Sequence, residues 1–302
     1  MARIADLGLQ EARIFLLWEA FQPQPDRVSD DALLRLETVL RAAERHEVGL
    51  VLSLFCGHMS GVNWLPGWAV DQSAASRIRT VRGRVVPGGA GDIYADAALL
   101  DPQLFLAQRL ASAFAGHGGL AGWDLGNEFS NLRWPAGPEA IERWSSLLTE
   151  ALRPARVNVA GGLHAPDLEQ DRGIRISSIA ASWDEVAMHG YPLYSEAAMA
   201  PDDPEWVPFV SATAARFADK RVNAQEFGLE PVKPPETRPH EIFCASSSSL
   251  GLLIQAGPGS GGGVGARRTK RSGWAAYAVP RTAARWRRTS AAVPKWTEAG
   301  VW

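Results

Sequence analysis

Two glutamates, Glu128 and Glu226, each stand at the end of an apolar run and could carry acid–base or nucleophilic chemistry. One run starts at Leu120 and ends in Asn127 and Glu128, and the other ends in Gln225 and Glu226. A strand that ends by presenting an amide and a carboxylate to a loop is typical of a reactive site. If both strands end at the same rim, the two carboxylates are the minimum needed to hydrolyse a glycosidic bond.

Short apolar runs alternate with stretches of helical periodicity along the first 230 residues, and this pattern predicts parallel βαβ units. Strands are expected at residues 12–18, 48–55, 120–128, 156–160, 185–189 and 221–228. Helices are expected at residues 2–10, 30–47, 102–116, 138–152 and 205–218. The segment 57–101 between them is rich in Gly, Pro and Trp. Loops of that length are functional or disordered.

These elements predict the α/β class and a (β/α)8 TIM barrel. The chain has 302 residues, 46% of them hydrophobic, and a single barrel takes about 250. The six expected strands are fewer than the eight of a closed barrel, and the chain begins inside what should be the first helix. The first and eighth strands are therefore expected to be missing or altered.

The bulk composition limits partners and compartment. A net charge of −2 and a pI near 6.3 give no reason to expect nucleic acid or an anionic membrane as partner. Cys56 and Cys244 are too few for a disulfide framework, and Cys56 is expected to be a buried free thiol. No run reaches the ~18 apolar residues of a membrane span. The N-terminus lacks the apolar core of a signal peptide, so the chain as written is expected in the cytoplasm, with secretion open if the true N-terminus lies upstream.

The sequence changes character after residue 244, which predicts a partial catalytic barrel over 1–244 and a separate tail over 245–302. Gly, Ser, Ala and Arg dominate this tail, and Glu298 is its only acid. One interpretation is a disordered basic tail able to bind polyanions. The other, which we favour, is out-of-frame translation of a GC-rich gene.

Four stretches together resemble clan A glycoside hydrolases, most closely the family 5 cellulases and endo-β-1,4-mannanases. They occur in the order of the family and cover roughly residues 1–230. The four are Arg13 in Ala12-Arg13-Ile14-Phe15, Trp123-Asp124-Leu125-Gly126-Asn127-Glu128, His189-Gly190-Tyr191-Pro192 and Gln225-Glu226-Phe227-Gly228.

The resemblance implies a retaining hydrolase that needs no cofactor and is endo-acting on β-1,4-linked mannan or glucan. It implies that Glu128 is the acid/base and Glu226 the nucleophile. It also implies that Asn127 contacts the sugar 2-hydroxyl, while Arg13 and Tyr191 hold the nucleophile. The family's eighth strand supplies a tryptophan to the cleaving subsite, and the context of Trp274, the nearby candidate, does not match.

Elementary electrostatics agrees with these roles. A retaining site needs its carboxyls about 5 Å apart, and at that separation their charges repel. One carboxyl is then expected to stay protonated near neutral pH. Arg13 beside Glu226 would favour the ionised form of Glu226 and leave the proton on Glu128.

Further candidates for substrate binding follow the strands or lie in the long loop, and each has a plainer alternative. The histidines could be structural, and the tryptophans could be ordinary packing instead of platforms for sugar rings. These candidates are Trp18, His58, Trp64, Trp68, His164 and His189.

Two other functions stay open at this point. The first is a metal-dependent barrel hydrolase, since three histidines follow strands, although the sequence offers no HxH or HExxH spacing. The second is a sugar-binding or defunct barrel, because an open barrel exposes two strand edges.

Overall fold

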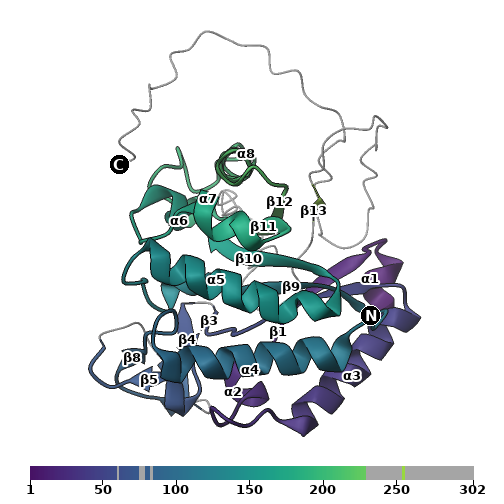
Figure 1. Ribbon diagram of the computed structural model, residues 1–302. Coiled ribbons are helices and arrows are strands. Elements are labelled where there is room, and N and C mark those ends of the chain that lie inside the picture. The colour runs from purple at the N-terminus through teal and green to yellow at the C-terminus, as the bar shows by residue number, and fades with distance from the viewer. Residues whose placement is uncertain (60, 75–78, 82–83, 229–253, 256–302) are drawn as a thin grey trace, which may run out of the picture.

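The computed structural model describes residues 1–59, 61–74, 79–81, 84–228 and 254–255. Within them, parallel strands curl into a half-barrel covered by helices, as in an incomplete (β/α)8 barrel (Figure 1). The main sheet has seven strands in the order β1-β2-β9-β10-β11-β12-β13. Its parallel strands are β1 (Glu11–Phe15), β2 (Gly49–Ser53), β9 (Leu120–Asn127), β10 (Asn158–His164), β11 (Glu185–Gly190) and β12 (Val222–Phe227). The short β13 (Ile254–Gln255) pairs antiparallel to β12.

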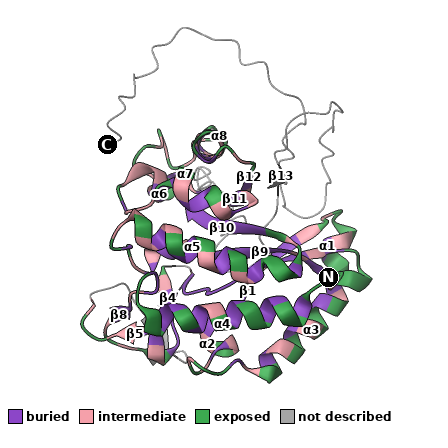
Figure 2. Ribbon diagram, in the orientation of Figure 1, coloured by how far each residue is buried: buried purple, intermediate pink, exposed green. Residues whose placement is uncertain are grey.

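The connections between these strands are mostly helical. The longer helices are α3 (Asp30–Arg45), α4 (Ala97–Phe114), α5 (Pro138–Leu152) and α8 (Trp206–Ala218), and the shorter ones are α1 (Ala2–Asp6), α2 (Trp18–Phe21), α6 (Pro166–Glu169) and α7 (Ile176–Ile179). In Figure 1, α4 and α5 lie side by side across the outer face of the sheet. Their buried stripes face the strands and their exposed stripes face solvent (Figure 2). Amphipathic helices of this kind are stabilised mainly by packing that apolar stripe.

Side chains at the helix starts explain where two of these helices begin. The Ser29 hydroxyl accepts a hydrogen bond from the Ala32 amide at 3.2 Å, and the Asp96 carboxylate accepts one from the Ala98 amide at 2.9 Å. Such caps satisfy amides that lack a partner within the helix. The Asp96 cap starts α4 five residues earlier than the sequence pattern predicts.

The predicted order of strands and longer helices is confirmed, and three regions differ. The first predicted strand, 12–18, ends at Phe15, and Trp18 instead begins α2. The segment 57–101 contains short strands: β3 (His58–Met59), β4 (Val62–Trp64), β5 (Val70–Asp71), β6 (Arg79–Val81), β7 (Arg84–Val85) and β8 (Gly89–Ala90). In addition, α6 and α7 between β10 and β11 were not predicted. Short pieces without a sustained period leave too little pattern to recognise.

Several expectations concern residues outside the described part of the chain. The boundary at residue 244, Cys244 and Trp274 lie there, and so does the tail apart from β13. Cys56 is buried with a free thiol, as expected, and burial raises its pKa to about 12. Among the described residues, the helices lack the combination of length and apolar character needed to cross a membrane.

A close approach between β9 and β10 sets the position of the glutamate that follows β9. A Cβ on Gly162 would lie 2.1 Å from the carbonyl oxygen of Gly126, and the register shifts at this point. The Gly162 carbonyl in turn accepts a hydrogen bond from the Glu128 amide at 3.0 Å. Only glycine leaves room for this approach.

We predict that Gly162→Ala lowers the free energy of unfolding by about 1–3 kcal/mol, the usual cost of overpacking. Urea denaturation measures this value. The control is Gly118→Ala, where the added Cβ meets only the far end of the exposed Glu44 side chain. Equal stability of the two variants would contradict the prediction.

Candidate active site

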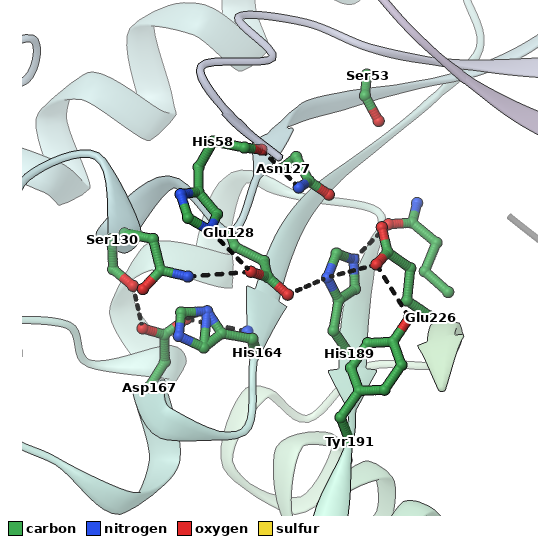
Figure 3. A network of polar contacts seen from close by, with 12 residues as sticks. Ser53, His58, Asn127, Glu128, Ser130, His164, Asp167, His189, Tyr191 and Glu226 are labelled. Atoms are coloured by element: carbon green, nitrogen blue, oxygen red, sulfur yellow. Dashed lines mark hydrogen bonds and ion pairs between the residues drawn. The ribbon is translucent and has the colours of Figure 1, made fainter. Parts of the chain in front are cut away.

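Glu128 and Glu226 lie together at the carboxyl ends of β9 and β12, with His189 between them (Figure 3). One carboxylate oxygen of each glutamate and one nitrogen of His189 lie within 4.8 Å of one another. The His189 Nδ1 atom is 3.0 Å from Glu128 Oε1 and 3.7 Å from Glu226 Oε2. Three parallel strands thus deliver these groups to one rim, where active sites of (β/α)8 barrels are found.

The side chain of Arg13 is fully buried and forms an ion pair with Glu226. Arg13, on β1, pairs with the Glu226 carboxylate through Nη1 and with Asp124 through Nη2 at 2.5 Å. Its Nε donates to Ser53 Oγ at 2.6 Å and to Asp124 at 2.8 Å, and Nη2 donates to Asn127 Oδ1 at 3.0 Å. A buried guanidinium needs this many acceptors, because an uncompensated buried charge is costly. Because Asp124, Ser53 and Asn127 hold the guanidinium in place, Arg13 in turn holds the Glu226 carboxylate in one position.

Glu128 is held in an unusual backbone conformation. Its φ is 47° and ψ is 49°, in the left-handed region that non-glycine residues seldom adopt. Such strain persists where surrounding contacts enforce it and is concentrated at functional sites. The Asn131 amide donates to Glu128 Oε2 at 3.0 Å, and His58 Nε2 lies 3.7 Å from the same oxygen. His58 is oriented by Asn63, whose Oδ1 is 2.7 Å from His58 Nδ1.

Both ring nitrogens of His189 face oxygen atoms, an arrangement that suits the doubly protonated imidazole. Its Nδ1 faces the carboxylates of Glu128 and Glu226, and its Nε2 lies 3.2 Å from Gln225 Oε1. Burial lowers the pKa of His189, but the charge of Glu226 and the hydrogen bond with Glu128 raise it by more. Burial raises the pKa of Glu128 as well. The hydrogen bond from His189 and the charges of the nearby histidines lower it by more, so the pKa of Glu128 lies below its usual range.

These shifts oppose one expectation from the sequence. The argument from carboxylate repulsion placed the proton on Glu128. In the structure His189 lies between the two carboxylates, and its hydrogen bond lowers the pKa of Glu128, which favours the ionised form of that acid.

Tyr191 and Asn127 complete the contacts of the predicted motifs. The Tyr191 hydroxyl donates to Glu226 Oε2 at 3.4 Å. Burial and the charge of Glu226 raise the pKa of Tyr191, so its hydroxyl stays a donor. The Asn127 amide nitrogen donates to the His58 carbonyl at 2.7 Å. Asn127 therefore links the strand of Glu128 to the segment that carries His58.

His164 lies near Glu128 but is engaged by a second buried arginine. The Arg172 Nη1 atom is 2.8 Å from His164 Nε2. Because a guanidinium can only donate, His164 Nε2 is the acceptor in this contact. Asp167 accepts from the His164 backbone amide at 3.0 Å and from the Ser130 hydroxyl at 2.6 Å.

The tryptophans predicted as cleft residues have different surroundings from those expected. Trp18 is only 1% exposed and packs edge-on against Trp68 at 5.2 Å between ring centroids. Trp18 donates to the Gln22 side chain, and Trp68 donates to the Gln22 carbonyl. Trp18 is therefore a packing residue, and the half-buried Trp68 contacts it edge-on. Trp64, half-buried in β4, adjoins Asn63, the partner of His58.

Several residues of the site were missed from the sequence. Asp124 and Ser53 carried a weak signal, because a carboxylate and a hydroxyl inside or at the end of apolar strands require buried partners. Asn131 and Arg172 gave no periodic or motif signal, and Gln225 lay in a quoted motif without being given a role there.

A metal could in principle take Glu128, His189 and Glu226 as ligands. The Arg13 guanidinium already pairs with Glu226, and a second cation there would be repelled. The three histidines considered for a metal site are also engaged: His58 with Asn63, His164 with Arg172 and His189 with the two glutamates. This arrangement does not fit a histidine-ligated metal.

No family model and no curated protein matches the sequence. Solved structures do match. The exo-β-1,4-mannosidase Op5Man5 from Opitutaceae bacterium strain TAV5 is 25% identical, with a TM-score of 0.60, over 74% of this chain and 40% of that one. The GH5_18 enzyme from Bifidobacterium longum subsp. longum is 18% identical, with a TM-score of 0.61, over 74% and 53%. The chain has the fold of clan A, family 5-like glycoside hydrolases.

A more distant structure extends this set and shows how much of such proteins the chain spans. Endo-glycoceramidase II from Rhodococcus sp. is 17% identical, with a TM-score of 0.54, over 77% of this chain and 60% of that one. The chain thus spans between 40% and 60% of the length of these three family 5-like structures.

We predict a pH dependence of stability from the Glu128–His189 pair. The raised pKa of His189 gives stabilisation that is fully present below its ordinary value of 6.5 and is lost as pH rises through the folded-state pKa. The lowered pKa of Glu128 gives stabilisation present above 4.5 and lost as pH falls through the folded-state pKa. The contribution of the pair should therefore be largest between pH 4.5 and 6.5.

Glu128→Gln should make the decline in unfolding free energy above pH 6.5 shallower, because the raised pKa of His189 loses one of its causes. The change is about 1.4 kcal/mol for each pKa unit removed. Urea denaturation from pH 5.5 to 9 measures it, with the exposed Glu150→Gln as control. A Glu128→Gln profile parallel to that of the unaltered chain would contradict the assignment.

Proposed function

We propose that the protein is a retaining β-glycosidase acting on β-1,4-linked mannosides, with glucosides as the second candidate. The observation that carries this proposal is the approach of the Glu128 and Glu226 carboxylate oxygens to within 4.8 Å. Retaining glycosidases need about 5 Å between their two carboxyl groups, whereas inverting enzymes leave room for a water.

The contacts of each carboxylate support an unequal division of labour. Glu226 is paired with Arg13 and Tyr191, which hold its carboxylate in position as a nucleophile. Glu128 is bonded to His189, a proton donor at 3.0 Å. A proton that moves from His189 to Glu128 makes Glu128 the general acid.

The proposed reaction proceeds in two displacements. Glu226 attacks the anomeric carbon and forms a glycosyl ester, while Glu128 protonates the departing oxygen. Glu128 then takes a proton from water, the water attacks the same carbon, and the ester bond to Glu226 breaks. No metal is required in this scheme.

The names of the matching solved structures suggest which sugar the proposed enzyme would cleave. Op5Man5 is an exo-β-1,4-mannosidase, and GH5_18 structures contain Manβ1-4GlcNAc. The Rhodococcus endo-glycoceramidase was captured as a lactosyl-enzyme intermediate, the covalent species that this scheme requires. These precedents favour β-mannosides, and they include both exo- and endo-acting enzymes. The endo action expected from the sequence is therefore tested by product analysis on a mannan oligosaccharide.

We predict that Glu128→Gln and Glu226→Gln each lower turnover of aryl β-mannosides and β-glucosides by about 10²–10⁴-fold or more. Glu150→Gln, an exposed change on α5, should leave turnover unaltered. A 2-deoxy-2-fluoro β-glycoside should label the unaltered protein on Glu226, as mass spectrometry of peptides would show.

Two outcomes separate this proposal from a barrel that only binds sugar. Binding of the same glycosides without turnover, unchanged in Glu226→Gln, would support the non-catalytic alternative. Turnover that is abolished by a chelator and survives both glutamate changes would instead point to a metal hydrolase.

A further inference from the structure

The two carboxylates divide the site into two sides. Figure 3 shows Glu226 and Tyr191 on one side of the Glu128 carboxylate, and Ser130, His164 and Asp167 on the other. In a retaining mechanism the nucleophile lies beneath the sugar that is transferred, and the acid lies next to the departing group. The side of Glu128 remote from Glu226 is then the side of the leaving group. This assignment rests on the proposed function.

A buried arginine occupies the leaving-group side and connects it to Glu128. Arg172 is only 8% exposed. Its Nη1 contacts Ser130 Oγ and Asn131 Oδ1, both at 3.2 Å, and its Nε and Nη2 donate to Gln170 Oε1 at 3.0 and 2.9 Å. Since Asn131 also donates to Glu128, one side chain separates this guanidinium from the acid. So many contacts hold the guanidinium in one position.

An exposed tryptophan stacks on that guanidinium. The Cζ of Arg172 lies 5.7 Å from the centre of the Trp134 ring, within the range of a cation–π contact. Trp134 is nevertheless 55% exposed, which leaves much of the indole open to a ligand. It follows Glu128 by six residues and lies outside the hydrophobic core of the described residues. Trp18 and Trp68, by comparison, pack edge-on against each other.

We propose that Trp134, backed by Arg172, is the platform for the leaving sugar, a hexopyranose whose own hydroxyl oxygen is the β-glycosidic oxygen. The C–H face of a pyranose is apolar and packs against an aromatic ring, while its hydroxyls stay in water. The guanidinium fixes the indole before the ligand arrives, so little side-chain freedom is lost on binding. Trp134 is thus a specificity residue for what is cleaved off, and it is separate from the groups that contact the transferred sugar.

The test compares two substrates that differ in the leaving group. β-1,4-Mannobiose loses a sugar, whereas β-mannosyl fluoride loses fluoride and has nothing to stack on Trp134. We predict that Trp134→Ala lowers kcat/KM for mannobiose by about three- to tenfold, and that it changes kcat/KM for the fluoride by less than twofold. Trp134→Phe should retain part of the mannobiose activity. Phe209→Ala, which removes a similarly exposed ring on α8, is the matched control and should affect neither substrate.

The outcomes distinguish this inference from the proposed function. Equal losses on both substrates, or no loss on mannobiose, would overturn the platform while leaving the hydrolase intact. If the unaltered protein turns over neither substrate, calorimetry decides. Mannobiose binding weakened about three- to tenfold in Trp134→Ala would keep the platform in a binding protein, and undiminished or undetectable binding would overturn it.

Discussion

The structure depends on keeping two half-buried carboxylates close together against their mutual repulsion. Glu128 and Glu226 approach within 4.8 Å, where two negative charges in a partly buried site are costly. Two cations offset that cost. Arg13 pairs with Glu226 from inside the barrel, and His189 lies between both acids. Neither cation could be removed without leaving a half-buried carboxylate uncompensated, so both are as much part of the site as the acids.

The half-barrel is sufficient to deliver these groups. Arg13 comes from β1, Glu128 and Glu226 follow or end β9 and β12, and His189 comes from β11. Parallel strands that end at the same rim bring residues more than two hundred positions apart into contact. The close approach at Gly162 and the register shifts beside Ala160 and Met188 turn the strand ends, which is a recognised use of bulges next to active sites.

The sequence predicted which strands carry the site residues better than it predicted which group holds the proton. The strands and longer helices were predictable because most of them have a sustained period, although the start of α4 at the Asp96 cap was not predicted. The meeting of Glu128 with Glu226 followed from the rule that parallel strands end together. The location of the proton did not follow, because it depends on His189 lying 3.0 Å from one acid and 3.7 Å from the other. No spacing in a sequence gives distances of that kind.

The surroundings of the tryptophans could not be predicted from the sequence either. Trp18 and Trp68 were predicted at the cleft from their place in the chain, yet they pack edge-on against each other. Trp134 drew no attention, because a single tryptophan in a loop has no pattern to distinguish it. Its significance rests on Arg172, whose guanidinium is buried by contacts from segments 130–131, 164 and 170 that only the fold brings together.

The charges of the site also bear on the proposed chemistry. Asp124, Glu128 and Glu226 provide three carboxylates, and Arg13 with His189 provides two cations, so the group carries one net negative charge. A proton that moves from His189 to Glu128 stays within the group and leaves this sum unchanged. The net negative charge that faces positive charge on the sugar ring in an oxocarbenium-like transition state is therefore the same whichever of the two holds the proton. His189 can then relay the proton without changing the net charge of the site.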